Sequence, residues 1–390
     1  MVCKKCNKRI KKNTTICPHC GAPQTETVSL SAIYAARTAP KKKRSAGKII
    51  LRIFIILLAV LLALGVAGWA TMYFMVDQNI QHGSELEVSD LEVNEELPQE
   101  DVINIALFGL DNRDKSTDGH SDAIIIVSID RVHNKIKMTS LGRDTLVKVD
   151  GYWSKGELTK ATHAFSYGAQ KKDMTGAGAA VKMLNQNFGM NISRYVYVSF
   201  PGFAEVIDVM GGVTVDVQQR EIYETNQNIS TLWEISKLKA PLLTKAGPQK
   251  LNGTQALAYS RIRKLDSDVK RGGRQQEVLK AVFEGVKTQP ISQYPKLIAS
   301  CLSICHTNLS SSEILSLATW AVTSNPTMEQ LSLPDESCKA WGGSHPDYAW
   351  VYIADTAYMT ARMHDFIYET NVAESMTPRR YSLGGTIPIP

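Results

Sequence analysis

The chain has 390 residues, of which 44% are hydrophobic and 21% charged, enough apolar sequence for a full core and accessory segments. Its net charge of +6 is unevenly spread: residues 1–52 hold 13 Lys and Arg against one acid, Glu26, so this stretch carries +12 and the rest carries −6. A basic head on an acidic body excludes a general nucleic-acid binder and indicates a charge gradient along the chain.

The first segment, residues 1–23, carries two CxxC pairs. Cys3, Cys6, Cys17 and Cys20 form the pattern C-x₂-C-x₁₀-C-x₂-C, and Gly21 follows the second pair. Each pair places two thiolates on one turn, and two such turns close a tetrahedral Zn²⁺ site. We therefore expect a small structural zinc ribbon, similar to those at the N-termini of many bacterial membrane proteins. A redox-active dithiol pair is the alternative, although no βαβ pattern surrounds either CxxC.

A basic linker, residues 24–48, leads to an apolar segment at 49–76. The 24 residues from Ile53 to Val76 carry no charge, and as a helix they would extend about 36 Å, enough to span a bilayer. Basic residues precede this run and acidic residues follow it, so the positive-inside rule places the N-terminus in the cytoplasm. We expect a single-pass protein of the cell membrane with its large domain outside. A cleaved signal peptide is the alternative, but the run is too long for one.

Acidic residues at 77–101 are expected to form a mobile stalk. The main domain is expected at 102–290, with 291–390 as its C-terminal part. Apolar or alternating runs predict strands at 102–110, 123–130, 135–141, 195–200 and 213–217. Helical spacing of apolar residues predicts helices at 177–187, 201–210, 252–259 and 274–287. Strands that alternate with helices predict a three-layer α/β domain.

Polar residues gather where the first three predicted strands begin or end. Asp111 follows the first strand, Asp122 precedes the second, and Gly142, Arg143 and Asp144 follow the third. If neighbouring strands are antiparallel or share a crossover edge, these groups converge at one rim of the sheet, where α/β sites usually form.

A second polar group follows the helix predicted at 252–259. Arg261 and Arg263 lie two residues apart, and Asp268, Arg271 and Gln275 follow. Arginine binds phosphate oxygens through charge-assisted hydrogen bonds. Carboxylates beside the arginines would repel a phosphate unless a hard cation such as Mg²⁺ bridged the two. The pattern indicates a diphosphate site with magnesium, and ordinary surface ion pairing is the alternative for any one of these residues.

These residues lie in segments that resemble the LytR–CpsA–Psr (LCP) family of Gram-positive bacteria over residues 102–287. The matching segments are INIALFGLDNR, HSDAIIIVSID, LGRDTLVKV, KATHAFSYG, PGFAEVIDVMGGVTVDV and KLNGTQALAYSRIRKLDSDVKRGGRQQEVL. The resemblance implies an α-β-α domain with a central mixed sheet. It also implies a phosphotransferase that moves a glycopolymer, such as teichoic acid, from a polyprenyl-diphosphate carrier to peptidoglycan.

The resemblance also implies roles for individual residues. Carried over by position, they are Asp111 and Asp122 (magnesium and diphosphate carboxylates), Arg143 (diphosphate), Asp144 (orienting Arg143), Arg261 and Arg263 (paired phosphate arginines), Asp268, Arg271 and Gln275 (the remaining polar wall) and Lys160 (a further cation). Asp268 or Asp144 would accept the proton of the acceptor hydroxyl. His120 stands where the family has Arg, so one cation becomes pH-dependent. Gly142 stands where the family has Pro.

Two other functions stay open. One is a non-catalytic sensor that binds polyprenyl phosphate and signals through the zinc ribbon to a cytoplasmic protein, and the other is a hydrolase that uses water instead of a sugar acceptor. Outside the head, Cys301 and Cys305 are one helical turn apart, and either could pair with Cys338. Three buried, reduced cysteines are the alternative.

Overall fold

The structure is a computed structural model that describes residues 1–24, 46–83, 86, 88–94, 97, 101–111, 119–263, 265, 268–290 and 293–388. Within these ranges a few side chains are left out, chiefly at 46–66 and 268–269. The predicted basic linker, residues 24–48, lies almost entirely outside the described residues. The chain divides into two units, Met1–Gly68 and Trp69–Pro390, which are described separately.

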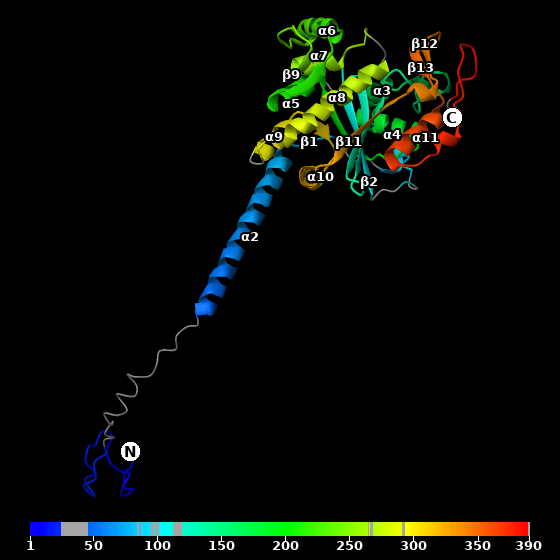
Figure 1. The fold of residues 1–390 in the computed structure, drawn as a ribbon. Helices are drawn as coiled ribbons and strands as arrows, with labels where there is room; N and C mark the ends of the chain where they lie inside the picture. Colours follow the sequence, from blue (N-terminus) through cyan, green and yellow to red (C-terminus); the bar gives the residue numbers. More distant parts are fainter. Residues whose placement is uncertain are drawn as a thin grey trace. The chain divides into compact units, whose positions relative to one another are not determined.

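Helix α2 (Ala46–Asn79) is a continuous helix of 34 residues that includes the predicted membrane segment, residues 49–76 (Figure 1). The prediction of a helix at this position is confirmed. In the part of the chain that the structure describes, no helix offers an apolar stretch long enough to cross a bilayer. The location of residues 49–76 in a membrane therefore stays a prediction.

The second unit is built on a seven-stranded mixed sheet with the strand order β1-β10-β7-β2-β3-β4-β11. In chain order these strands are β1 (Gln81–His82), β2 (Val102–Leu110), β3 (Ser121–Asp130), β4 (Lys135–Leu141), β7 (Arg194–Ser199), β10 (His306–Thr307) and β11 (Thr327–Leu333). Strands β2, β3 and β4 are antiparallel neighbours, whereas β7 runs parallel to β2 and β11 runs parallel to β4. The predicted mixed sheet is confirmed.

Helices cover both faces of this sheet (Figure 1). One face packs against α3 (His163–Ala169), α4 (Gly176–Phe188) and α11 (Thr356–Tyr368), and this is the largest core. The other packs against α5 (Phe200–Val209), α7 (Gly253–Ser260), α8 (Asp268–Lys287) and α10 (Ser311–Ser324). Because side chains alternate along a strand, Phe108 faces the first layer and Gly109 the second. The result is the predicted α-β-α arrangement.

Three small hairpins and two helices complete the unit. The hairpins are β5 (Leu146–Lys148) with β6 (Leu158–Lys160), β8 (Val213–Val217) with β9 (Gly247–Leu251), and β12 (Trp341–His345) with β13 (Ala349–Ile353). The helices are α6 (Glu221–Ser236) and α9 (Tyr294–Leu302). The strand predicted at 213–217 is therefore present, but it pairs with β9 and not with the central sheet.

The described part of the predicted stalk, residues 77–101, belongs to the folded domain. Ile80 and Leu91 are 8% and 3% exposed, β1 pairs with β10 at the sheet edge, and the Asn94 side chain donates a hydrogen bond to the Gly189 carbonyl (3.1 Å). The expectation of a mobile stalk is wrong for these residues, because the apolar side chains among the acids are buried against the domain.

Candidate functional site

The order of the strands brings the predicted polar groups to one rim of the sheet. Because β2, β3 and β4 are consecutive antiparallel strands, the end of β2, the start of β3 and the end of β4 lie at the same edge. Asp111 follows β2, and its backbone N–H donates to the His120 carbonyl just before β3 (3.0 Å). The predicted convergence is confirmed.

Asp122 is the buried centre of the site, with 6% of its side chain exposed. One of its carboxylate oxygens accepts a hydrogen bond from Arg143, and the other accepts one from Nη2 of Arg271 at 2.9 Å. The Gln275 side chain lies 3.5 Å from the Asp122 carbonyl. Burial alone would raise the pKa of Asp122, but the charges of Arg271 and Arg143 and their hydrogen bonds hold it below its ordinary value.

Asp144 is the second buried carboxylate, with 6% of its side chain exposed, and three cations surround it. Nη2 of Arg263 lies 3.0 Å from one carboxylate oxygen and Nε of Arg143 lies 3.5 Å from the same atom. The ammonium of Lys160, on β6, lies 3.4 Å from the other oxygen. Asp144 therefore fixes the position of Arg143, and it also fixes Arg263 and Lys160, which come from two other segments of the chain.

Arg261 approaches the rim from the end of α7. This helix begins with a capping box in which Asn252 and Gln255 each accept a hydrogen bond from the other's backbone N–H, and Arg261 follows its last residue. The guanidinium lies 3.5 Å from Asp111 and 4.2 Å above the centre of the Phe200 ring. Burial lowers the pKa of Arg261, an effect that Asp111 partly offsets, and the side chain remains a cation.

Among its described side chains, the site carries more positive than negative charge. Among the described side chains that contact one another here, five cations, Arg143, Lys160, Arg261, Arg263 and Arg271, meet three carboxylates, Asp111, Asp122 and Asp144. The excess of two positive charges suits a bound anion such as a diphosphate. Of the predicted site residues, Asp268 is the first residue of α8, and its side chain lies outside the described residues.

An apolar cavity opens beside these arginines, and sequence reasoning did not locate it. It lies between the sheet and the second helical layer, and Arg261, Arg271 and Gln275 belong to its wall. Its apolar lining comprises Leu107, Gly109, Ala123, Ile125, Val198, Phe200, Phe203, Leu257 and Leu279. The alternation along β2 and β3 marks the strand residues of this set, but only the fold shows that α5, α7 and α8 stand off the sheet here.

Two histidines extend the site toward α3. His120 accepts or donates a hydrogen bond with the Ser166 hydroxyl at 2.8 Å, and its ring centre lies 5.0 Å from that of His163. Burial, followed by the positive charges of His120 and Lys160, lowers the pKa of His163 to about 4. His163 is therefore neutral at physiological pH, and it bonds the Thr159 hydroxyl at 2.7 Å.

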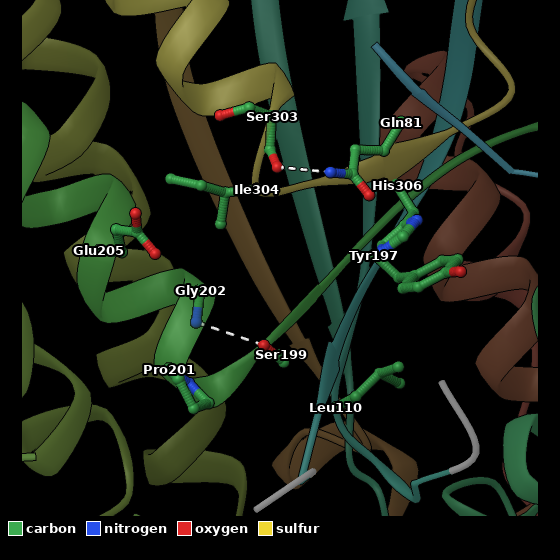
Figure 2. Close-up of a pocket in the computed structure, with 10 residues that line it drawn as sticks. All are labelled: Gln81, Leu110, Tyr197, Ser199, Pro201, Gly202, Glu205, Ser303, Ile304 and His306. Carbon is green, nitrogen blue, oxygen red and sulfur yellow. Dashed lines mark hydrogen bonds between the residues drawn. The ribbon is translucent and has the colours of Figure 1, made fainter. Parts of the chain in front are cut away.

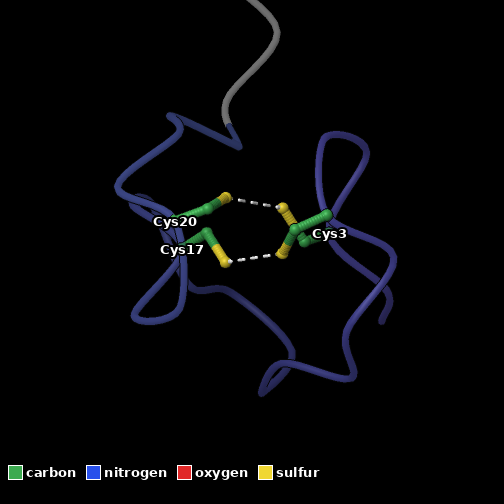
Figure 3. Close-up of side chains that lie close together, drawn as sticks. Cys3, Cys17 and Cys20 are labelled. Carbon is green, nitrogen blue, oxygen red and sulfur yellow. Dashed lines mark hydrogen bonds between the residues drawn. The ribbon is translucent and has the colours of Figure 1, made fainter.

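The cysteines of the first unit converge on one point (Figure 3). The sulfur atoms of Cys3, Cys6, Cys17 and Cys20 all lie within 4.8 Å of one another, with Cys3–Cys20 at 3.6 Å and Cys6–Cys17 at 3.7 Å. A tetrahedral zinc with Zn–S bonds of about 2.3 Å requires sulfur–sulfur separations of about 3.8 Å. The four sulfurs therefore have the spacing that zinc needs.

The pairing of Cys338 with Cys301 or Cys305 is wrong. Cys305 directly precedes β10 and Cys338 lies five residues beyond β11, and these two strands stand at opposite sides of the seven-stranded sheet, with four strands between them. Five intervals of about 4.8 Å place the two strands about 24 Å apart, which is too far for a disulfide, and all three cysteines are free. Cys338 is buried among apolar side chains of the largest core, as the alternative of buried, reduced cysteines expects.

Comparison with known proteins gives the same family that the motifs indicate. The sequence profile of the LytR_cpsA_psr family matches residues 72–364. An uncharacterised protein of Staphylococcus aureus (strain NCTC 8325 / PS 47) is 32% identical over 300 residues, which is 73% of this chain and 68% of the relative. The polyisoprenyl-teichoic acid–peptidoglycan teichoic acid transferase TagT of Bacillus subtilis (strain 168) is 29% identical over 242 residues, 60% of this chain and 69% of TagT.

The fold is similar to that of TagT as well. The structure of TagT bound to LI-WTA superimposes with a TM-score of 0.57 at 23% identity, covering 73% of this chain and all of that one. The mixed sheet and its two helical layers are thus those of a known architecture. With its profile matching most of the sequence, the chain belongs to the LytR–CpsA–Psr family.

Proposed function

We propose that the chain transfers a glycopolymer from a polyprenyl-diphosphate carrier to peptidoglycan. The observation that carries this proposal is that two different environments adjoin. One is the group of arginines and Lys160 at the sheet rim, and the other is the apolar cavity, whose wall includes Arg261, Arg271 and Gln275 of that rim. A diphosphate attached to an isoprenoid chain needs both. The reaction that the printed name of TagT describes supports the same substrate class.

The carrier would lie with its isoprenoid chain in the apolar cavity and its diphosphate at the rim. Ala123, Ile125 and Leu279 would contact the chain, because burying apolar surface contributes about 25 cal/mol per Å². Arg261 and Arg271, at the mouth of the cavity, would bind the first phosphate. Arg143 and Arg263 lie on the Asp144 side and would bind the second.

The reaction would be an in-line displacement at the phosphorus next to the glycopolymer. The acceptor hydroxyl forms a new P–O bond, and the bond to the bridging oxygen breaks and leaves the lipid monophosphate. The arginines stabilise the negative charge that grows on the leaving group. Asp144 already accepts contacts from three cations, so we assign it a positioning role and propose Asp268 as the acceptor of the hydroxyl proton.

Magnesium is the second part of the proposal. Asp111, 36% exposed at the mouth of the site, would supply one hard oxygen ligand, and Asp122 would share an oxygen that already accepts a hydrogen bond from Arg143 or Arg271. An ion held by one or two carboxylates and completed by substrate oxygens fits this pair. The ion would supply Lewis-acid stabilisation of phosphate charge. Transfer that continues undiminished in excess chelator would remove it from the proposal.

The topology and the zinc site complete the proposal. Residues 49–76 would anchor the chain in the cell membrane with the N-terminus in the cytoplasm and the catalytic domain outside, where a lipid carrier presents its head group. The four cysteines would hold a structural Zn²⁺, since their sulfur spacing fits it. The resulting ribbon would offer a contact for a cytoplasmic protein partner.

One experiment separates the three candidate functions. The full-length protein in detergent is incubated with a labelled polyprenyl-diphosphate-linked glycan and with peptidoglycan oligomers. We expect the label on the oligomers. Label released as free glycan phosphate would identify a hydrolase, and binding without turnover would identify a sensor. The variant Asp268→Asn should bind the labelled carrier as the unmodified protein does and lose transfer.

A further inference from the structure

A second cavity, of about 170 Å³, lies at the same rim of the sheet, outside the site assembled above (Figure 2). Leu110, at the end of β2, and Tyr197 and Ser199, at the end of β7, form its floor. Glu205 of α5 and His306 of β10 face it from opposite sides (Figure 2). We call it the rim cavity.

The strand residues that line the rim cavity and the apolar cavity point to opposite faces of β2 and β7, and α5 borders both cavities, with Glu205 in the first and Phe203 in the second. Gly109 pairs with Val198, and both line the apolar cavity, whereas Leu110 pairs with Ser199, and both line the rim cavity. Since successive side chains of a strand point to opposite faces, β2 and β7 form a wall between the two. Asp111 directly follows Leu110 at the end of this wall.

The lining of the rim cavity is polar on one side and aromatic on the other. The rings of Tyr197 and His306 are stacked with their centres 4.7 Å apart and an interplanar angle of 13°, and both residues line the cavity. Burial lowers the pKa of His306, so its ring is a neutral hydrogen-bonding group. Glu205 and Ser199 add oxygen atoms. The Gln81 side chain is fixed by its bond to the Ser303 carbonyl (2.8 Å).

This combination of an aromatic surface with hydrogen-bonding groups is suited to a sugar ring, which has apolar C–H faces and a rim of hydroxyl groups. Its size agrees, because a cavity of about 170 Å³ holds on the order of a dozen water-sized groups, enough for the atoms of one sugar ring. A polyprenyl chain, in contrast, has no partner for Glu205.

In-line transfer fixes where the acceptor has to stand. The attacking oxygen and the leaving oxygen lie on opposite sides of the phosphorus, so an acceptor enters from the side away from the lipid phosphate. With the carrier on the α8 face of β2 and β7, the opposite side is that of the rim cavity.

We propose that the rim cavity binds the acceptor saccharide, a ring of the peptidoglycan glycan strand, and directs its free hydroxyl past Asp111 toward the phosphorus next to the glycopolymer. This rests on the proposed function. Glu205 and His306 would hydrogen-bond ring substituents, and the Tyr197–His306 stack would support the ring face. These residues determine acceptor affinity and do not take part in the chemical step.

The test compares Glu205→Gln and His306→Leu with the unmodified full-length protein in detergent, using a lipid-linked glycan as donor and peptidoglycan oligomers as acceptor. Loss of a hydrogen bond corresponds to roughly a tenfold change in binding when the bond is worth about 1.4 kcal/mol, which is the upper end for a neutral group such as His306 and the lower end for a charged one such as Glu205. We expect each variant to raise the KM for the acceptor about tenfold or more and to leave the Kd for the donor unchanged. Glu234→Gln, an exposed position on α6, is the matched control.

An acceptor KM within twofold of the unmodified value in both variants would overturn the acceptor assignment, and so would a weakened donor Kd, because the cavity would then belong to the carrier. Thermal melting checks that both variants fold. If the unmodified protein shows no transfer to peptidoglycan at all, the proposed function fails instead, so the two failures are distinguishable.

Discussion

Arg271 and Asp122 form a buried ion pair at the centre of the rim, with Nη2 and Oδ2 2.9 Å apart and 3% and 6% of their side chains exposed. The pair joins α8 to the start of β3. It therefore connects the helix that covers the apolar cavity to the strand that forms its floor. Each of the two buried charges is compensated by the other.

Replacing Asp122 with Asn should destabilise the domain and weaken diphosphate binding together. The change leaves Arg271 and Arg143 facing a neutral group in a buried site, and breaking a buried pair costs about 3–5 kcal/mol. Chemical denaturation measures the loss. Asp216→Asn, at an exposed position of β8, serves as the control, and a variant as stable as the unmodified protein would contradict the buried role of the pair.

Arg261→Ala should weaken the binding of both octaprenyl diphosphate and inorganic pyrophosphate, by about tenfold or more, because one charge-assisted hydrogen bond is worth roughly 1.5–3 kcal/mol. Calorimetric titration measures both affinities. Arg131→Ala removes an exposed arginine that bonds Ser316 away from the rim and should change neither. Unaltered affinities in Arg261→Ala would exclude this arginine from the site.

Ala123→Leu should affect the two ligands differently. Ala123 lines the apolar cavity and its Cβ would lie 3.1 Å from a Cβ built on Gly109, so a larger side chain occupies space that the isoprenoid needs. We expect weaker binding of octaprenyl diphosphate with unchanged binding of pyrophosphate in the same titration. Equal loss for both ligands would mean that the substitution disturbs the rim and not the cavity.

His163 should make the domain less stable as the pH falls from about 6.5 to about 4. The pKa of His163 is about 4 in the folded protein against about 6.5 in an unfolded chain, so the unfolded state takes up the proton first and stability rises with pH across this window. His163→Gln should flatten the dependence of the melting temperature on pH. His82→Gln, on β1, should keep it, and identical curves for both variants would rule out His163 as its source.

Purified full-length protein should contain one zinc per chain, measured by elemental analysis, and Cys17→Ser should remove it. Structural zinc sites contribute directly to folding, so the variant should also expose residues 1–24 to protease. Cys301→Ser lies outside the cluster and should retain the metal. A zinc-free protein with all four thiols reduced would refute the ribbon.

The strands of the sheet core were predictable because each is a buried apolar run with polar residues at its ends. Asp111, Asp122 and Arg143 could be placed at one rim for the same reason, before any contact was known. β11 was not predicted, since it lies far along the chain from its partner β4 and the consecutive polar residues Glu329 and Gln330 interrupt its apolar pattern. Pairing over such a separation leaves no local signal.

The two cavities escaped sequence analysis for a different reason. Val198 and Ser199 are neighbours in the chain, and only the direction of each side chain decides that one faces the apolar cavity and the other the rim cavity. For the segment around Ile80 and Leu91, the acidic composition predicted exposure to solvent. A few apolar side chains at intervals nevertheless bury the segment against the domain.

The position of β11 also sets the order in which the domain can be completed during synthesis. This strand, residues 327–333, joins the sheet along the whole of β4, and Gln276 bridges the two by donating to the carbonyls of Met138 and Leu331. Until residue 333 has left the ribosome, β4 is an open strand edge of the kind that pairs with foreign chains. The nascent protein therefore depends on its last quarter to cover a strand made in its second, and a chain that ends between the two strands keeps the β4 edge open to pairing.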